Sequence, residues 1–195
     1  MLEVYKMKKD LLNEGSVEEM MTIILRKKGV TEPLEFGYNT YGKPYLDAFP
    51  EFHFNGSHSG EYIVCALCSG AIGIDIQEIL MDKDVMALAN RFMSTCESRE
   101  LALLDAEYRH AAFYRLWAQN EAYMKYTGLG MALPMSSFTV KVDRGHYNII
   151  QQDAVVENIT LLPVRIEKGY EGWLCGEFEE QSVSVITLTA EDLQP

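Results

Sequence analysis

The strongest constraint on the fold is an apolar stretch in the first half of the chain that is interrupted once by turn-forming residues. Residues 62–67 and 71–76 are rich in Ile, Val, Leu and Ala, and Ser69-Gly70 stands between them. Short apolar runs bounded by turn residues are typical of buried β-strands. A tight connection favours strands that pair with each other. We therefore expect a β-hairpin over these residues, at the centre of the first half.

Helical patterns flank this β segment on both sides. Ser16 is a typical N-cap followed by acidic and then apolar residues, which predicts a helix that ends near Gly29. A helical pattern resumes over residues 85–104, with a capping-box pair at Ser94 and Glu97. A third helix is expected to follow and to end near Thr127, before two glycines and a proline.

The last third of the chain has a β pattern. β-Branched residues alternate with polar ones over residues 138–142 and 182–188, which predicts an antiparallel sheet with turns at Arg144-Gly145 and Lys168-Gly169. The order of strands, helices and strands indicates an α+β fold of two lobes. We expect an N-terminal lobe over residues 1–82 and a C-terminal lobe over residues 83–195, with no repeat or linker between them.

Composition excludes several classes of protein. The 195 residues are 48% hydrophobic and 24% charged, as in an ordinary globular domain. The net charge of −12 opposes binding of a phosphate polymer, so we expect no nucleic-acid partner. The chain has neither an apolar run of about 18 residues nor an N-terminal secretory signal. We therefore expect a cytoplasmic protein that does not insert into a membrane.

Four cysteines occur, at positions 65, 68, 96 and 175. Cys65 and Cys68 have the spacing of zinc ligands, but nothing supplies the second half of such a site. Three positions apart on a strand, they would also face opposite sides. We expect reduced thiols in the core.

The first candidate for chemistry is Asp75, on the second strand of the expected hairpin. With a period of two, Ile72, Ile74 and Ile76 share one face of this strand, and Asp75 shares the other with a glycine and an amide. An acid and an amide beside a glycine leave room for a ligand. The alternative is that this face is simply the solvent side of an amphipathic strand.

The second candidate is Glu121, on the third helix. It lies four residues after Trp117 and three before Met124, so it belongs to the stripe that faces the core. A carboxylate there needs a partner, because buried charges are normally paired or bound to metal. Lys125, one turn later, offers a surface ion pair as the alternative to a bound cation.

The third candidate is the stretch of residues 54–60, which combines Ser57, His58 and Ser59 with glycines. Hydroxyls, free backbone N–H groups and an imidazole suit an anion such as phosphate. Lys43, in the stiff turn of residues 41–44, could meet the same anion. The alternative is a turn capped by Ser and Asn. A serine-hydrolase elbow is excluded, because His58 occupies the central position.

Taken in order, these stretches resemble the Sfp-type 4′-phosphopantetheinyl transferases. The resemblance covers residues 36–142 and rests on five motifs: Tyr41-Gly-Lys-Pro44, Phe54-Asn-Gly-Ser-His-Ser59, Ile72-Gly-Ile-Asp-Ile76, Phe113-Tyr-Arg-Leu-Trp117 with Glu121 and Lys125, and Gly128-Leu-Gly-Met-Ala-Leu-Pro134. Each motif alone is weak, but five with matching order and spacing are specific.

The resemblance implies a pseudodimer of two similar lobes, each a small antiparallel sheet packed with helices, with coenzyme A and Mg²⁺ in the cleft between them. It implies transfer of 4′-phosphopantetheine from coenzyme A to a serine of an acyl- or peptidyl-carrier protein, with release of 3′,5′-ADP. Such proteins activate the carriers of fatty acid, polyketide and nonribosomal peptide biosynthesis. Two-lobed members are usually monomers, so a monomer is expected.

The resemblance also implies roles at the metal. Asp75 and Glu121 would be Mg²⁺ ligands, Lys125 would contact the diphosphate, and Glu121 would take the proton of the attacking serine, directly or through water. Many members carry a second acid on the strand where this chain has Gln77. A neutral amide would reach the ion through a water instead. The family's usual Lys before the helix glutamate is Asn120 here, which removes a cation expected near the phosphates.

For coenzyme A itself, the resemblance implies that Lys43, Ser57 and His58 hold the 3′-phosphate, with Lys125 on the diphosphate. The family also uses basic residues near its N-terminus, for which Lys8 and Lys9 are the candidates. The departures at positions 77 and 120 support an alternative, a catalytically impaired homologue that binds coenzyme A or a carrier protein. A plain acidic interaction domain is a third hypothesis, and it predicts no coenzyme A binding.

Overall fold

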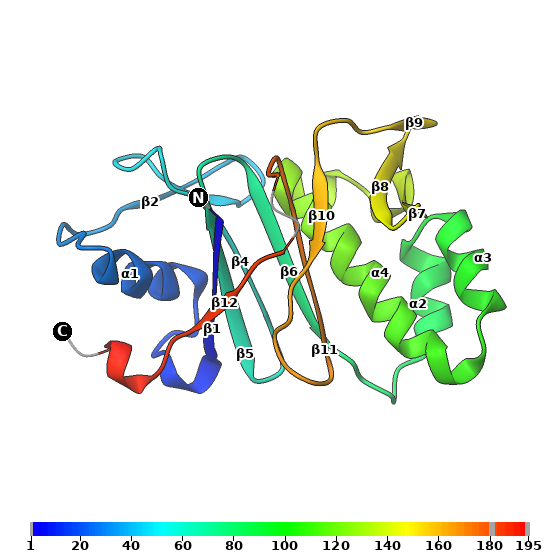
Figure 1. Ribbon diagram of the computed structural model, residues 1–195, viewed down its shortest axis with the longest axis horizontal. Helices are drawn as coiled ribbons and strands as arrows, with labels where there is room; N and C mark the ends of the chain where they lie inside the picture. Colours follow the sequence, from blue (N-terminus) through cyan, green and yellow to red (C-terminus); the bar gives the residue numbers. More distant parts are fainter. Residues whose placement is uncertain (1, 180–181, 194–195) are drawn as a thin grey trace.

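Two β-sheets lie between helices in the computed structural model, which describes residues 2–179 and 182–193. Figure 1 shows α1 on one side of the pair of sheets and α2, α3 and α4 on the other. Three apolar clusters fill the spaces between these layers: one under α1, one between the two sheets and one under α4. The expected α+β fold class is confirmed.

The first sheet has the strand order β12-β1-β5-β4. Its strands are β1 (Leu2–Lys8), β4 (His53–Ser59), β5 (Tyr62–Cys68) and β12 (Val185–Thr187). The central strand β5 is apolar on both faces. Its Cys65 packs in the cluster under α1 (Val17–Lys27), and Cys68 packs in the cluster between the sheets. The prediction that these two cysteines face opposite sides is therefore confirmed.

The second sheet has the order β10-β11-β6 and is formed by β6 (Ile72–Glu78), β10 (Thr160–Pro163) and β11 (Tyr170–Gly176). The three isoleucines of β6 face the first sheet and are almost fully buried. This arrangement confirms the predicted alternation along β6. The opposite face of β6 is turned toward α4, so Asp75 does not lie on a solvent face.

The predicted hairpin between β5 and β6 is wrong. β5 pairs along both edges, with β1 and with β4, and β6 pairs instead with β11. A strand that is apolar on both faces is stabilised at the centre of a sheet, where both of its edges are used. The turn at Ser69-Gly70 therefore passes the chain from one sheet to the other.

The helices end near the predicted residues, but the helical pattern of residues 85–104 forms two helices that meet at the capping box. They are α1, α2 (Val85–Phe92), α3 (Thr95–Leu103) and α4 (Ala106–Thr127). Ser16 caps α1 by accepting from the Glu19 N–H, and Ser94 with Glu97 forms the predicted capping box of α3. α4 ends at Gly128, whose φ of 69° is left-handed and suits glycine.

The remaining elements are short. A two-stranded sheet pairs β2 (Phe36–Tyr38) with β3 (Pro44–Leu46), and a three-stranded sheet contains β7 (Phe138–Asp143), β8 (His146–Gln151) and β9 (Ala154–Val155). Single 3₁₀ turns occur at Lys9–Leu11, Gly130–Ala132, Met135–Ser137 and Ala190–Leu193. The predicted turns at 144–145 and 168–169 lie between β7 and β8 and between β10 and β11.

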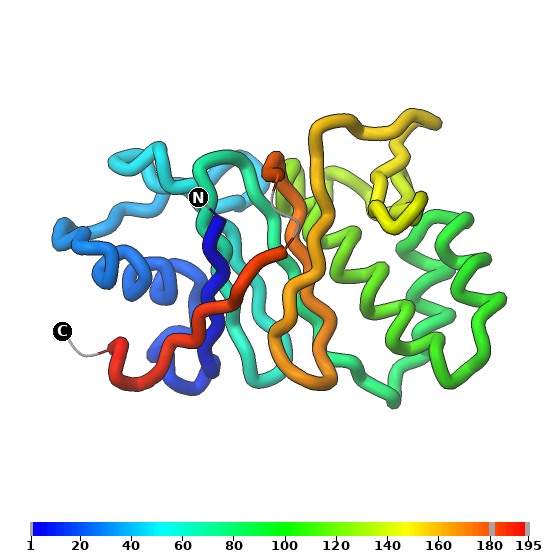
Figure 2. The backbone as a smooth tube through the Cα atoms, in the orientation of Figure 1, coloured from blue at the N-terminus to red at the C-terminus, as the bar shows by residue number. Residues whose placement is uncertain are grey.

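The end of the described chain returns to the first sheet. In Figure 2 the segment that contains β12 runs beside β1, and the two strands pair in parallel, with Val4 opposite Val185. The prediction that residues 182–188 belong to an antiparallel C-terminal sheet is therefore wrong. The lobe division at residues 82 and 83 stays a prediction. Strand pairing crosses it twice, through β6 with β11 and through β1 with β12.

The four cysteines are free thiols, and Cys65, Cys68 and Cys175 are buried, as expected. Cys96 is half-buried. Among the described residues, no helix combines the length and the apolar character needed to cross a membrane.

Candidate active site at the junction of β4, β6 and α4

Asp75 is the centre of the site, and its carboxylate is held by three side chains. The residue is 2% exposed. Its Oδ1 accepts from Ser57 Oγ at 2.7 Å and from Lys125 Nζ at 2.7 Å. Its Oδ2 accepts from Gln77 Nε2 at 2.8 Å. A buried carboxylate needs such donors, because burial removes the hydration that stabilises its charge.

A glycine lets α4 approach this strand. A Cβ built on Gly73 would lie 2.1 Å from the Ala122 carbonyl oxygen and 2.3 Å from the Tyr126 backbone nitrogen. Both distances are far below van der Waals contact, so only glycine allows the backbones of β6 and α4 to lie so close. Gly73 and Asp75 share a face of β6, so this contact places α4 directly beside the carboxylate.

Lys125 joins α4 to both strands. Its Nζ donates to Asp75 Oδ1, to the Ile74 carbonyl at 3.1 Å and to the Gly56 carbonyl at 3.4 Å. The ion pair predicted as the alternative for Glu121 is therefore made by Asp75. Among the described residues, no ion pair joins Lys125 to Glu121. One ammonium group thus connects β4, β6 and α4.

Glu121 lies one turn before Lys125 on α4 and is half-buried. Burial raises the pKa of its carboxyl, and the negative charge of Asp75 raises it further, whereas Lys125 opposes the shift. The negative charge of Asp75 thus acts on Glu121, as is usual for two acids in the same region.

Carboxylate oxygens from Asp75 and Glu121 fit a hard divalent cation such as Mg²⁺. Within residues 2–179 and 182–193, no group of three or more His, Cys, Asp or Glu side chains has the arrangement of a metal site. An ion held by two carboxylates would complete its coordination with water and ligand oxygens, which is the usual habit of Mg²⁺. The donor set therefore fits the metal.

His58 projects from β4 beside two cations. Its side chain is exposed, and its pKa is lowered by partial burial and by the positive charges of Lys9 and Lys125, against the charge of Asp75. Three basic groups thus share one small region of a chain with an overall negative charge. Lys8, by contrast, forms an ion pair with Glu61. A local positive field of this kind attracts anions.

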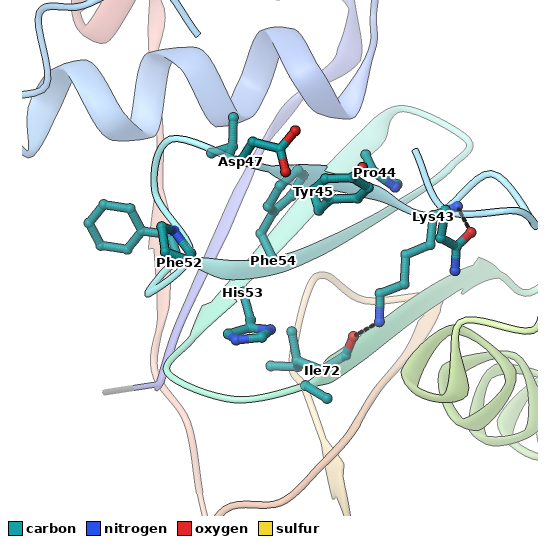
Figure 3. A pocket seen from close by; sticks show the side chains of 12 residues that line it. Lys43, Pro44, Tyr45, Asp47, Phe52, His53, Phe54 and Ile72 are labelled. Carbon is teal, nitrogen blue, oxygen red and sulfur yellow. Dashed lines mark hydrogen bonds between the residues drawn. The ribbon is translucent and has the colours of Figure 1, made fainter. Parts of the chain in front are cut away.

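Lys43 has protein partners for its ammonium group. Figure 3 shows its side chain extended to the Ile72 carbonyl, at 2.8 Å. The same Nζ donates to the carbonyls of Lys125 at 2.7 Å and Tyr126 at 3.3 Å. Burial lowers the pKa of Lys43 to about 8. The resemblance placed Lys43 with Ser57 and His58 on one phosphate, whereas here Lys43 and Ser57 both contact protein atoms.

A pocket of about 360 Å³ adjoins Lys43, between β3 and the first residues of β4 and β6. Figure 3 shows aromatic and polar side chains around it. The lining residues labelled there are Lys43, Pro44, Tyr45, Asp47, Phe52, His53, Phe54 and Ile72. The pocket shares Lys43 and Ile72 with the contacts that hold the end of α4, but Asp75, Glu121 and Lys125 are not among its lining residues.

Asn120 is fully buried and faces the protein interior. It lies near Glu97, whose pKa is raised by burial. Neither polar atom of the Asn120 amide has a hydrogen-bond partner among the described residues. Glu97 accepts from the N–H and Oγ of Ser94 and from the Val140 N–H. Position 120 therefore belongs to the α3–α4–β7 core rather than to a surface where a phosphate could bind.

Asn55 and Ser59, which the sequence analysis had placed in an anion-binding stretch, instead accept hydrogen bonds from β6. Asn55 Oδ1 accepts from the Ile74 N–H at 2.9 Å, and Ser59 Oγ accepts from the Glu78 N–H at 2.9 Å. The spacing of polar residues by two positions on β4 indicates that their side chains share one face. Only the structure shows that β6 lies against this face and supplies the N–H donors.

Comparison with known proteins identifies one family over this region. The family model for the 4′-phosphopantetheinyl transferase superfamily matches residues 71–175, which include β6 and α4. The matched segment therefore contains Asp75, Glu121 and Lys125, the residues at the centre of the site.

Curated relatives carry the same description. A 4′-phosphopantetheinyl transferase of Bacillus subtilis is 43% identical over 117 residues, 60% of this chain and 51% of the relative. The transferase Sfp of Bacillus subtilis strain 168 is 30% identical over 161 residues, 82% of this chain and 70% of the relative. The transferase gsp of Aneurinibacillus migulanus is 32% identical over 163 residues, 84% of this chain and 66% of the relative. This chain spans about half the length of several curated relatives that it matches.

Proposed function

This chain belongs to the 4′-phosphopantetheinyl transferase superfamily, and we propose that it moves 4′-phosphopantetheine from coenzyme A to a serine of an acyl- or peptidyl-carrier protein. The observation that carries the proposal is the ion pair of Asp75 on β6 with Lys125 on α4, one turn after Glu121. Two acids and a cation at one point suit a diphosphate and a divalent ion.

Asp75 and Glu121 would hold Mg²⁺, with Gln77 reaching the ion through a water. When bound, the ion neutralises charge on the diphosphate and so stabilises the transition state. Gln77 donates its amide N–H to Asp75, which supports an indirect rather than a direct role at the metal.

The residues of the chain would then perform the transfer. The carrier serine Oγ attacks the phosphorus that bears pantetheine, and the bond from that phosphorus to the bridging oxygen of the diphosphate breaks. Glu121 accepts the serine proton, directly or through water. Lys125 neutralises charge on the diphosphate, and 3′,5′-ADP leaves.

The basic region around His58 would hold the 3′-phosphate of coenzyme A. His58 is exposed and lies in the field of Lys9 and Lys125, so an anion there would accept from the imidazole N–H and be attracted by the Lys9 charge. Lys43 and Ser57, the other residues implied by the resemblance, would contribute only by exchanging contacts that they make with the protein.

One observation favours a second candidate function. Gln77 is neutral where many family members carry an acid, which reduces the negative charge available to a cation. A catalytically impaired homologue that binds coenzyme A or a carrier protein would keep the basic region around His58 and lose turnover.

The decisive experiment is Mg²⁺-dependent labelling of acyl- and peptidyl-carrier proteins with a fluorescent coenzyme A. We expect wild type to label at least one carrier. Asp75→Asn and Glu121→Gln should each lower the rate by about 10²-fold or more, as expected when a group that stabilises transition-state charge is lost. Both variants keep the shape of the side chain. Asp75→Asn, however, turns an amide N–H toward donors that the carboxylate accepts from, so thermal unfolding of both variants is compared with wild type to separate lost chemistry from lost folding. Glu107→Gln, an exposed acid on the same helix, is the matched control.

Three results would decide between the hypotheses. Wild-type rates in Asp75→Asn or Glu121→Gln would refute the metal assignment. Coenzyme A binding without labelling of any carrier would favour the impaired homologue. A folded protein that binds no coenzyme A would favour a plain interaction domain.

A further inference from the structure

Strands β4 and β6 run side by side without sharing a backbone ladder in the described part of the chain. β4 pairs with β5, and β6 pairs with β11. In an antiparallel strand, alternate N–H groups point to opposite edges. The N–H groups of Ile74, Ile76 and Glu78 therefore need acceptors on the side of β6 that faces β4.

Side chains of β4 supply those acceptors. Asn55 accepts from Ile74 at 2.9 Å, Ser57 from Ile76 at 3.4 Å and Ser59 from Glu78 at 2.9 Å. We call these three residues the β4 row. They are spaced by two positions, so their side chains share one face of β4. The β4 row joins the two sheets along the edge where the site lies.

Ser57, the middle member of the β4 row, differs from the other two. Its Oγ also donates to Asp75 Oδ1 at 2.7 Å, and the residue is 6% exposed. A serine hydroxyl carries one proton, and an ionised carboxylate can only accept. The single proton of Ser57 is therefore committed to Asp75. An oxygen of the 3′-phosphate is also an acceptor, so it would compete with Asp75 for that proton.

We propose that Ser57 is a positioning residue for the Asp75 carboxylate and not a ligand of the coenzyme A 3′-phosphate. The inference rests on the proposed function, because it assumes that Asp75 holds the metal. Ser57 fixes one oxygen of Asp75 while Gln77 fixes the other. The carboxylate then meets the cation without having to be reoriented, and this is the usual effect of groups that hydrogen-bond metal ligands.

The proposal separates two quantities that a phosphate ligand would affect differently. The first is the Mg²⁺ concentration that gives half of the maximal increase in coenzyme A affinity, here called the Mg²⁺ midpoint. The second is the ratio of affinities for coenzyme A and for dephospho-coenzyme A, which lacks the 3′-phosphate. A positioning residue for Asp75 changes the Mg²⁺ midpoint, whereas a ligand of the 3′-phosphate changes the affinity ratio.

The test is calorimetric titration of both nucleotides at a series of Mg²⁺ concentrations, which needs no carrier protein and no turnover. We expect Ser57→Ala to raise the Mg²⁺ midpoint by about tenfold, the usual lower effect of losing a group that orients a metal ligand. Its affinity ratio should stay within about twofold of wild type. Ser57→Thr keeps the hydroxyl and should restore the Mg²⁺ midpoint.

Two neighbouring variants supply the controls. Ser59→Ala removes a bond of the β4 row that has no contact with a carboxylate, so it should leave the Mg²⁺ midpoint unchanged. His58→Ala should lower the affinity ratio, because His58 belongs to the exposed basic region. If Ser57→Ala does not fold, Ser57→Cys takes its place, because a thiol is a weaker donor than a hydroxyl. A wild-type affinity ratio with a raised Mg²⁺ midpoint in Ser57→Cys supports positioning, and a reduced affinity ratio with an unchanged Mg²⁺ midpoint overturns it.

The overturning results are equally specific. A reduced affinity ratio with an unchanged Mg²⁺ midpoint in Ser57→Ala would make Ser57 a phosphate ligand. If Ser57→Ala and Ser59→Ala changed the Mg²⁺ midpoint equally, Ser57 would serve only to join the two sheets. Mg²⁺-dependent coenzyme A binding without carrier labelling would contradict the proposed transfer. The positioning role of Ser57 would still be tested by the Mg²⁺ midpoints of its variants. Coenzyme A binding independent of Mg²⁺ would overturn the inference alone.

Discussion

Glu121 combines a buried position with a neighbouring negative charge, and its titration follows from that combination. Its pKa is raised above the ordinary carboxyl value by burial and by Asp75. Without metal, the pKa of Glu121 is therefore higher in the folded protein than in the unfolded chain. At a pH between these two pKa values, Glu121 is protonated more often in the folded protein. The contribution of Glu121 to the free energy of unfolding is therefore largest below the pKa of the unfolded state. It decreases as the pH rises through the pKa of the folded state.

We predict that Glu121→Gln is more stable than wild type without metal, by an amount that grows as the pH rises above about 4.5 and then levels off. The measurement is chemical denaturation of both proteins in a chelator, at intervals between pH 4.5 and 8. Glu107→Gln, which changes an exposed acid, should show no such divergence. A constant difference between wild type and Glu121→Gln at all pH values would contradict the burial of Glu121.

At the scale of elements, the loop between β2 and β3 acts as a cap for α4. Asn39 Nδ2 donates to the Gly128 carbonyl at 2.8 Å, and its Oδ1 accepts from the N–H groups of Tyr41 and Lys43, both at 2.9 Å. Lys43 then reaches the carbonyls of Lys125 and Tyr126. The last carbonyls of a helix lack partners within the helix, so this loop satisfies them.

Asn39→Ala should therefore lower the free energy of unfolding by about 1–3 kcal/mol, because it removes one bond to α4 and two that shape the loop. Asn148→Ala is the comparison, since the Asn148 side chain makes no hydrogen bond to any residue that the structure describes. Denaturant titration of both variants measures the difference. Equal stability of the two variants would show that the loop does not hold α4.

At the scale of the whole molecule, one close contact sets how the second sheet and α4 meet. The contact is at Gly73, where a Cβ would meet backbone atoms of Ala122 and Tyr126 below 2.5 Å. Backbone atoms cannot move aside as a flexible side chain can. Any side chain at this position would push α4 away from β6 and separate Lys125 and Glu121 from Asp75.

We predict that Gly73→Ala lowers the free energy of unfolding by about 3 kcal/mol or more, as an overpacked core substitution does. Its Mg²⁺-dependent coenzyme A binding should be lost as well. Gly70→Ala is the matched control: it lies in the turn before β6, and nothing lies within 4 Å of its Cβ position. If Gly73→Ala were as stable as Gly70→Ala, the direct contact between β6 and α4 would be disproved.

Helix ends and strand alternation were predictable because local interactions set them. Ser16, the pair Ser94 and Glu97, and Gly128 each satisfy backbone groups within one turn of their own helix. The alternation along β6 likewise needs only a strand and an apolar partner surface. The helical period placed Glu121 on the stripe that faces the core. For Asp75 the period gave only the face opposite the isoleucines, and the packing of α4 decided that this face is buried.

The pairing of strands did not follow from local pattern. The turn at Ser69-Gly70 favoured a hairpin, but both edges of β5 are taken by β1 and β4. β12 joins β1 across almost the whole length of the chain. Contacts between distant segments depend on which edges and faces remain open, and a window of neighbouring residues holds no information about that.

The chain's amino-acid order was thus sufficient for the α+β class, the family resemblance, the helix boundaries and the candidate acids, because short-range sterics and capping act within a few residues. The partners of those acids were settled by folding. Lys125 pairs with Asp75 instead of Glu121, Ser57 donates to the same carboxylate, and Lys43 caps α4. Each of these bonds joins residues between 18 and 82 positions apart, so each exists only where packing brings β4, β6, α4 and the loop between β2 and β3 together.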